Sequence, residues 1–152
     1  MKRLILILLL ISSFSIYAAG NCKGRELVEA QKKVSTLIKS IKTVKHPWQS
    51  LQKSFKNNLD CMNVNEAYDL GEAIRYIFFW RWDALSDLSE FKKQDTKFYQ
   101  FVFSGLADET ALSEDLNNIL VSAQSKCPKG QEVICNDIKK IILLNPILKS
   151  KP

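Results

Sequence analysis

The chain has 152 residues, 46% hydrophobic and 25% charged, with a formal net charge of +6 at pH 7. This length fits one domain with one core, and no internal repeat or low-complexity linker divides it. The positive charge does not indicate nucleic-acid binding, because the basic residues are spread over both ends of the chain and no recognised nucleic-acid-binding module is present.

Residues 1–20 have the layout of a cleavable secretion signal. Lys2 and Arg3 give a positive start, residues 4–11 are an uninterrupted aliphatic run, and small residues follow at 18–20. The apolar run is shorter than the roughly 20 residues needed to span a bilayer, and no later stretch approaches that length. We therefore predict an exported protein without a transmembrane segment.

Cleavage after Ala19 or Gly20 would leave a periplasmic or secreted domain over residues 21–152. The alternative is a lipoprotein anchored at Cys22, but Asn21 is a poor residue before a lipidated cysteine. Cleavage without lipidation is the preferred interpretation.

Four cysteines lie in the exported part: Cys22, Cys61, Cys127 and Cys135. An even number in an exported chain predicts two disulfides. Metal ligation is not predicted, because zinc sites use close ligand pairs with two to four residues between them and none occurs here. Among the three pairings, Cys127–Cys135, which closes a short loop containing Pro-Lys-Gly, and Cys22–Cys61 are preferred.

Charge is unevenly distributed along the exported part, which holds 20 basic and 16 acidic residues once Lys2 and Arg3 are removed. Residues 21–63 hold nine basic and three acidic side chains, residues 64–120 hold five and eleven, and residues 121–152 hold six and two. The preferred explanation is that the basic terminal helices fold against the acidic middle. The alternative is a face that meets a charged partner.

The first helix is predicted over about residues 25–44. Apolar residues recur there at steps of three and four: Leu27, Ala30, Val34, Leu37, Ile41 and Val44. On the opposite side Arg25, Lys32 and Lys39 form a row at steps of seven, which is either a solvated helix face or a surface that binds an anionic envelope component.

His46-Pro47 breaks this helix, because proline lacks an amide donor and restricts the residue before it. A second, shorter helix follows, with apolar residues at Trp48, Leu51, Phe55 and Leu59. Consecutive helices joined by a short turn usually pack antiparallel, which is why Cys22 is paired with Cys61.

A third helix is predicted from Asn63 or Asn65, with an apolar stripe that continues to Leu88. Between Tyr76 and Trp82 the sequence is apolar on every side except at Arg81, so this helix is expected to be the central element of the domain. A β-strand is the alternative for the aromatic run alone.

Three further helices complete the prediction. The first covers about residues 98–105, the second opens at Asp108 or Thr110 with its apolar face from Leu112 to Ala123, and the third runs from Val133 to Asn145-Pro146. The expected fold is all-α, a compact bundle-like single domain of about six helices with two disulfides.

No catalytic or cofactor signature is present. His46, the only histidine, precedes a proline and has no nearby nucleophile or metal-ligand partner in the sequence, and no phosphate-binding loop, HExxH pair or GxSxG elbow occurs. Asp83 and Asp87 lie one helical turn apart, where a hydrolase could use two carboxylates, although such pairs are common on solvated helices.

Arg81 breaks the apolar stripe, so it is expected to meet a carboxylate inside the domain, or else to line a pocket or interface, or to extend its head to water. With its neighbours Trp80 and Trp82 it forms the candidate binding site.

These observations favour a periplasmic or secreted, non-enzymatic interaction protein without a cofactor, which binds another macromolecule, most simply a protein of the envelope. An immunity or inhibitor protein against a cell-wall-targeting toxin is one form of this function. The alternatives are a small envelope hydrolase that uses acidic residues of the central helix, and an envelope-surface binder that uses the cationic row of the first helix.

Overall fold

The computed structural model describes residues 25–58, 64–108 and 110–149, and within them the chain is all-α, with no β-strand. Eight α-helices and one short 3-10 helix follow in order: α2 (Arg25–Ser40), α3 (Pro47–Asn58), α4 (Val64–Trp80), η3 (Trp82–Ala84), α5 (Leu85–Gln94), α6 (Thr96–Ala107), α7 (Ser113–Ser125), α8 (Glu132–Leu144) and α9 (Pro146–Lys149). The predicted fold class is confirmed; the helix count exceeds six because the long third helix is divided and Pro146 starts a further short helix.

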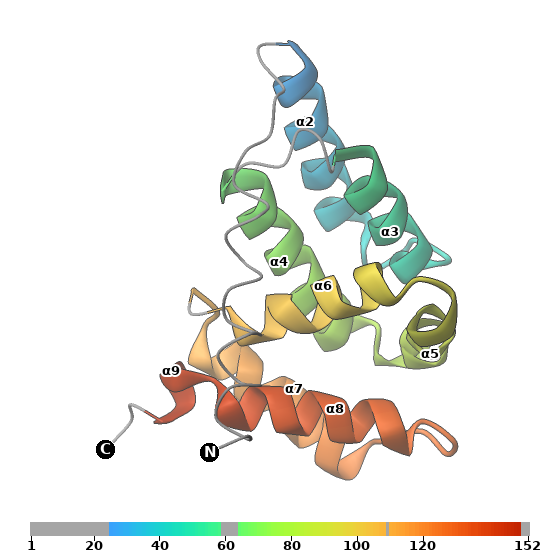
Figure 1. Ribbon diagram of the computed structural model, residues 1–152, viewed down its shortest axis with the longest axis vertical. Coiled ribbons are helices and arrows are strands. Elements are labelled where there is room, and N and C mark those ends of the chain that lie inside the picture. Colours follow the sequence, from blue (N-terminus) through green and yellow to red (C-terminus); the bar gives the residue numbers. More distant parts are fainter. Residues whose placement is uncertain (1–24, 59–63, 109, 150–152) are drawn as a thin grey trace, which may run out of the picture.

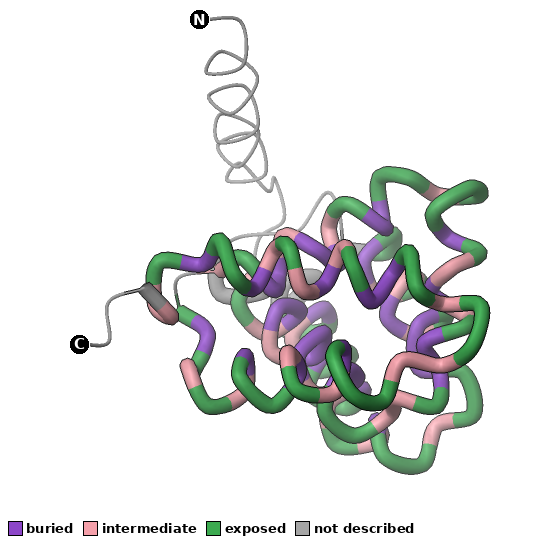
Figure 2. The backbone as a smooth tube through the Cα atoms, turned by 90° about the horizontal axis from the view of Figure 1, so that it is seen from below, coloured by how far each residue is buried: buried purple, intermediate pink, exposed green. Residues whose placement is uncertain are grey.

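The helices are arranged around α4, which packs against α2, α3, α6 and α7 (Figure 1). In this view α2, α3 and α4 form the upper part, α7 and α8 lie side by side in the lower part, and α5 and α6 lie between them. The buried residues follow the sides of the helices that face one another (Figure 2). The prediction that the third helix is central agrees with this arrangement.

The prediction that the third helix continues to Leu88 is wrong. α4 ends at Trp80, and Arg81 has φ −129° and ψ 47°, outside the helical region. The chain then forms η3 and turns into α5. The apolar spacing does not reveal this break, because Leu85 and Leu88 keep the helical spacing. They are buried, but they belong to a separate helix, α5. The β-strand alternative for the aromatic run does not form.

The first two helices agree with their predicted apolar faces. Ala30, Val34 and Leu37 are buried on α2, and Trp48, Leu51 and Phe55 are buried on α3. The first helix is shorter than predicted, ending at Ser40, and Ile41 and Val44 lie in the turn that follows. Pro47 is the first residue of α3, a position where the missing amide hydrogen costs nothing.

Aspartate side chains set the starts of α6 and α7 in different ways. The Asp95 carboxylate caps α6 by accepting a hydrogen bond from the Phe98 amide. Asp108 also accepts hydrogen bonds, at 2.8 and 2.7 Å, from the amide and hydroxyl of Thr110, which makes a turn and delays the start of α7 to Ser113. Because of this later start, Leu112 is exposed rather than part of the buried face. Val133, in the first turn of α8, is exposed as well.

The buried arginine of the described residues is Arg75, whose exposed fraction is 4%. It donates from Nη1 to the carbonyl oxygen of Gly105 at 3.4 Å. Asn145 donates from Nδ2 to the carbonyl oxygens of Leu106 and Asp108 at 3.2 and 3.3 Å. These two side chains satisfy carbonyl groups at the end of α6, which would otherwise lack partners.

The Cys127–Cys135 disulfide is present as predicted and joins the end of α7 to the first turn of α8. Its Cα atoms are 6.1 Å apart. Cys22 and Cys61 lie outside the described residues, as does the predicted signal peptide over residues 1–20. Among the described helices, none combines the length and the apolar character required to cross a membrane.

An ion pair and a histidine–carboxylate contact join the basic first part of the chain to the acidic middle. The ammonium group of Lys56 lies 2.9 Å from the Asp95 carboxylate, and His46 Nδ1 lies 3.5 Å from the Asp87 carboxylate. These contacts are the ones expected if the basic helices fold against the acidic middle. The pairing is reversed in the C-terminal part. There the C-terminal segment supplies the acid, Asp137, and the middle of the chain supplies the base, Lys92 of α5, at 2.8 Å.

Candidate functional site

The segment of residues 79–82 carries the most exposed aromatic side chains at the end of α4. Phe79 is 40% exposed and Trp80 is 49% exposed, although Ile77 and Phe78 directly before them are buried. The rings of Phe79 and Trp80 are in edge contact, with centroids 4.7 Å apart. We call these two residues the aromatic ridge. Helical periodicity explains the exposure of the ridge. Ile77 and Phe78 lie on the face of α4 that packs in the core, and the next two residues lie on the opposite face.

A hollow lies on each side of the aromatic ridge. The α2-side hollow has a volume of about 410 Å³. It is lined by Ile38, Lys39, Ile41, Lys42, Tyr76 and Trp80. The α7-side hollow has a volume of about 230 Å³. It is lined by Phe79, Asn118, Val121, Ser122 and Lys126. Trp80 therefore faces one hollow and Phe79 the other, and their touching rings divide the two.

Every charged side chain that lines the two hollows is a lysine: Lys39, Lys42 and Lys126. The Lys42 ammonium group lies 3.6 Å from the centroid of a Trp80 ring. Such a cation–π contact contributes about 0.5–1 kcal/mol at an exposed site. Tyr76 adds a neutral hydroxyl, since its hydrogen bond with Glu72, together with burial, raises its pKa.

Arg81 fixes the wall of the α2-side hollow. Its Nη1 donates to the carbonyl oxygens of Ile41 and Val44, at 3.3 and 2.5 Å, in the turn after α2. Its Nη2 lies 2.9 Å from the carboxylate of Asp83. The hydrogen bond with Asp83 raises the pKa of Arg81 and lowers that of Asp83. Because Asp83 is 66% exposed, Arg81 does not form the buried ion pair expected from the apolar stripe.

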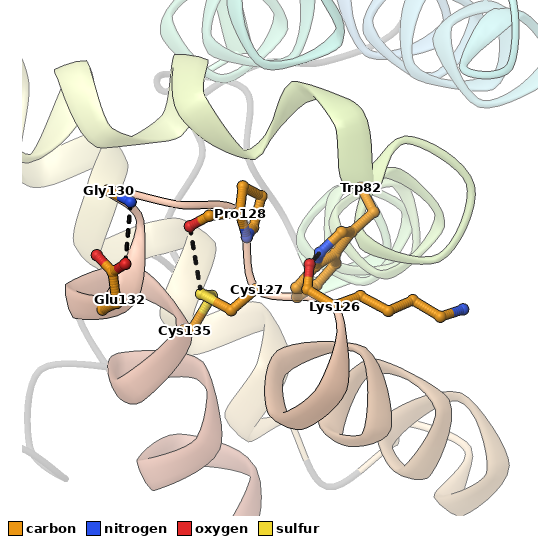
Figure 3. Close-up of a disulfide and its surroundings, with 7 residues drawn as sticks. All are labelled: Trp82, Lys126, Cys127, Pro128, Gly130, Glu132 and Cys135. Atoms are coloured by element: carbon orange, nitrogen blue, oxygen red, sulfur yellow. Dashed lines mark hydrogen bonds between the residues drawn. A yellow bond between two sulfur atoms is a disulfide. The ribbon is translucent and has the colours of Figure 1, made fainter.

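Trp82 fixes the wall of the α7-side hollow. Its indole Nε1 donates to the carbonyl oxygen of Lys126 at 2.9 Å, just after the end of α7 (Figure 3). Figure 3 also shows the Cys127–Cys135 disulfide beside this contact, where it closes the turn into α8. The hydrogen bond and the disulfide together hold Lys126 at the edge of the hollow.

The predicted binding residues thus lie in one segment but have different surroundings. Trp80 is presented to solvent, whereas Arg81 and Trp82 connect the ridge to its two walls. Sequence reasoning did not single out Phe79, Lys42 or Lys126, whereas Lys39 belongs to the cationic row predicted on the first helix. The adjacent aromatic residues Phe79 and Trp80 were the available signal of an exposed site. A helix that packs against four others buries most of its circumference but not all of it, so some residues of an all-apolar stretch must face solvent.

The carboxylates considered for hydrolysis do not line either hollow. Asp83 is paired with Arg81, and the Asp87 carboxylate contacts His46 and accepts a hydrogen bond from Gln49 at 3.3 Å. Both therefore have structural partners. In the part of the chain that the structure describes, no three His, Cys, Asp or Glu side chains gather as a group that could hold a metal ion.

Comparison with known proteins gives no relative: no protein-family model, no curated protein and no solved structure matches this chain.

Proposed function

We propose that this chain is an exported, non-enzymatic interaction protein that binds another protein through the aromatic ridge. The observation that carries the proposal is the exposure of the Phe79 and Trp80 rings between two hollows. Burying large aromatic side chains is a main source of binding energy at protein interfaces, where tryptophan, tyrosine and arginine are the commonest hot-spot residues.

The ridge is also held in place before any partner arrives. Arg81 and Trp82 tie it to the turn after α2 and to the end of α7, so little conformational freedom remains to be lost on binding. The hydrolase alternative has no comparable support, because Asp83 and Asp87 already have structural partners and lie outside the lining of both hollows.

An immunity or inhibitor protein against a cell-wall-targeting toxin is the form of this function that we propose. Such a protein needs export, stability in an oxidising compartment and a preformed contact surface, but no catalytic residue. The Cys127–Cys135 disulfide suits such a compartment.

Affinity capture with the mature chain tests the binding function. Extracts of the exported fraction of producing cells are passed over the native chain, a Trp80→Ser variant and a Leu143→Ser control, which removes an exposed apolar side chain on α8. We expect a protein that is retained by the native chain and the control and is lost with Trp80→Ser. Equal retention by all three chains, or no retained protein, would contradict the proposal.

Export is tested separately by N-terminal sequencing of the protein recovered from the cell envelope or medium. The sequence should begin at Gly20 or Asn21. An intact Met1 in the cytoplasm would contradict export and with it the envelope setting of the proposed function.

A further inference from the structure

We propose that the partner meets the aromatic ridge with an acidic polypeptide segment, in which carboxylates flank large apolar side chains. This inference rests on the proposed function and adds the chemistry of the partner. The segment lies across the end of α4, with one apolar side chain in the α2-side hollow and another in the α7-side hollow.

Charge complementarity carries the first step. Lys39 and Lys42 stand at the α2-side hollow and Lys126 stands at the α7-side hollow, and no carboxylate lines either one. All three lysines are exposed. The Lys42 ammonium group lies over the Trp80 ring, and a carboxylate is a stronger partner for an ammonium group than the face of an aromatic ring.

The apolar floor of the α2-side hollow carries the second step. Ile38 and Trp80 offer hydrocarbon and ring surface in the hollow that the two lysines also line. A small inorganic anion would contact the ammonium groups and leave this surface in water. A ligand that carries negative charge next to an apolar side chain satisfies both parts at once.

A polypeptide fits the two hollows better than a membrane surface does. The α7-side hollow adds the Asn118 amide and the Ser122 hydroxyl beside Phe79, and these groups can donate to and accept from a peptide backbone. A bilayer surface is smooth on this scale and would rest on the ridge without filling the hollows beside it. Separate side chains on one strand of polypeptide can enter both.

Selection from a random peptide library displayed on phage tests the inference directly. The library is panned against the immobilised mature chain, after depletion on a Trp80→Ala variant. We expect the enriched peptides to carry a net negative charge and at least one aromatic or large aliphatic residue. Enrichment of neutral or basic peptides, or no enrichment, would overturn the inference.

Calorimetric titration of an enriched peptide then assigns the contacts. Replacing Lys39 and Lys42 together by glutamine should weaken binding about tenfold or more, as should Trp80→Ala. Glutamine at the exposed Lys93 and Lys140, which line neither hollow, is the matched control and should change affinity less than about twofold. Equal effects of both lysine pairs would show an unspecific attraction between net charges and overturn the assignment.

Flotation with vesicles of phosphatidylglycerol separates the membrane alternative. Binding of vesicles that needs Lys39 and Lys42, without enrichment of acidic peptides, would assign the surface to anionic lipid and overturn the inference. The proposed function fails on a different result. If capture finds a Trp80-dependent protein whose contact segment is neutral or basic, only the acidic partner is wrong, whereas failure of capture removes the protein partner altogether.

Discussion

Replacement of Arg81 by alanine tests whether this side chain holds the turn after α2 against the end of α4. The change removes two charge-assisted hydrogen bonds to the carbonyls of Ile41 and Val44 and the ion pair with Asp83. Hydrogen bonds that involve a charged group are worth about 1.5–3 kcal/mol each, but only when water cannot replace them. Because the Arg81 side chain keeps 16% of its surface exposed, we discount the pair of bonds to about 2 kcal/mol in total.

The ion pair adds less. Asp83 is mostly exposed, and exposed pairs contribute about 0–1 kcal/mol. The free energy of unfolding should therefore fall by about 2–3 kcal/mol, less than the 3–5 kcal/mol typical for breaking a buried ion pair. Urea unfolding of the mature domain, followed by far-UV circular dichroism, measures this difference.

Asp83→Asn is the matched control, since it removes the charge of the partner and leaves both carbonyl contacts in place. Its cost should stay below about 1 kcal/mol. If Arg81→Ala is no more costly than Asp83→Asn, the carbonyl contacts do not stabilise the fold. The role of Arg81 in positioning the α2-side hollow would then be wrong.

Gly105→Ala should lower the melting temperature despite the better helix propensity of alanine, because the new Cβ would lie 2.6 Å from Ile74 Cδ1. Adding Ile74→Val removes that atom and should restore most of the loss. A double variant that melts no higher than Gly105→Ala would contradict this explanation. For Asp95, burial raises the pKa but hydrogen bonds from Lys56 and neighbouring groups outweigh it, so the folded pKa is low. Its contribution is present above the unfolded pKa of about 3.9 and is lost as pH falls through the folded value, so urea midpoints of Asp95→Asn should depend less on pH below about 4. Mass mapping without reduction should find Cys22 linked to Cys61, and free thiols at these positions would refute the second disulfide.

Much of the fold follows from local periodicity. The buried faces of α2 and α3 are found because Val34, Leu37, Trp48 and Leu51 recur at helical spacing. The turn between these helices is signalled by Pro47, which cannot follow a helical residue without steric conflict. These features depend on a few neighbouring residues, so a single sequence is enough to reveal them.

The burial of arginines could not be predicted in the same way. Arg81 was assigned to a continuing helix, although the chain leaves helical geometry at that residue. Arg75 was overlooked because it lies beside the apolar stripe. Its burial depends on α6, whose Gly105 allows a close approach to Ile74 of α4. The two hollows depend likewise on how α2 and α7 flank α4, which sequence spacing does not encode.

The three tryptophans of the chain occupy three different environments, and this gives the protein its own optical probes. Trp48 is 1% exposed and stacks edge-on against Phe78, so its emission should shift to longer wavelength only when the domain unfolds. Trp80 stands in solvent beside lysines, where iodide ions gather and collide with the excited ring. A ligand in the α2-side hollow would shield Trp80 from this quenching and leave the emission of Trp48 unchanged, so occupation of the surface and loss of the fold can be followed in one unlabelled sample.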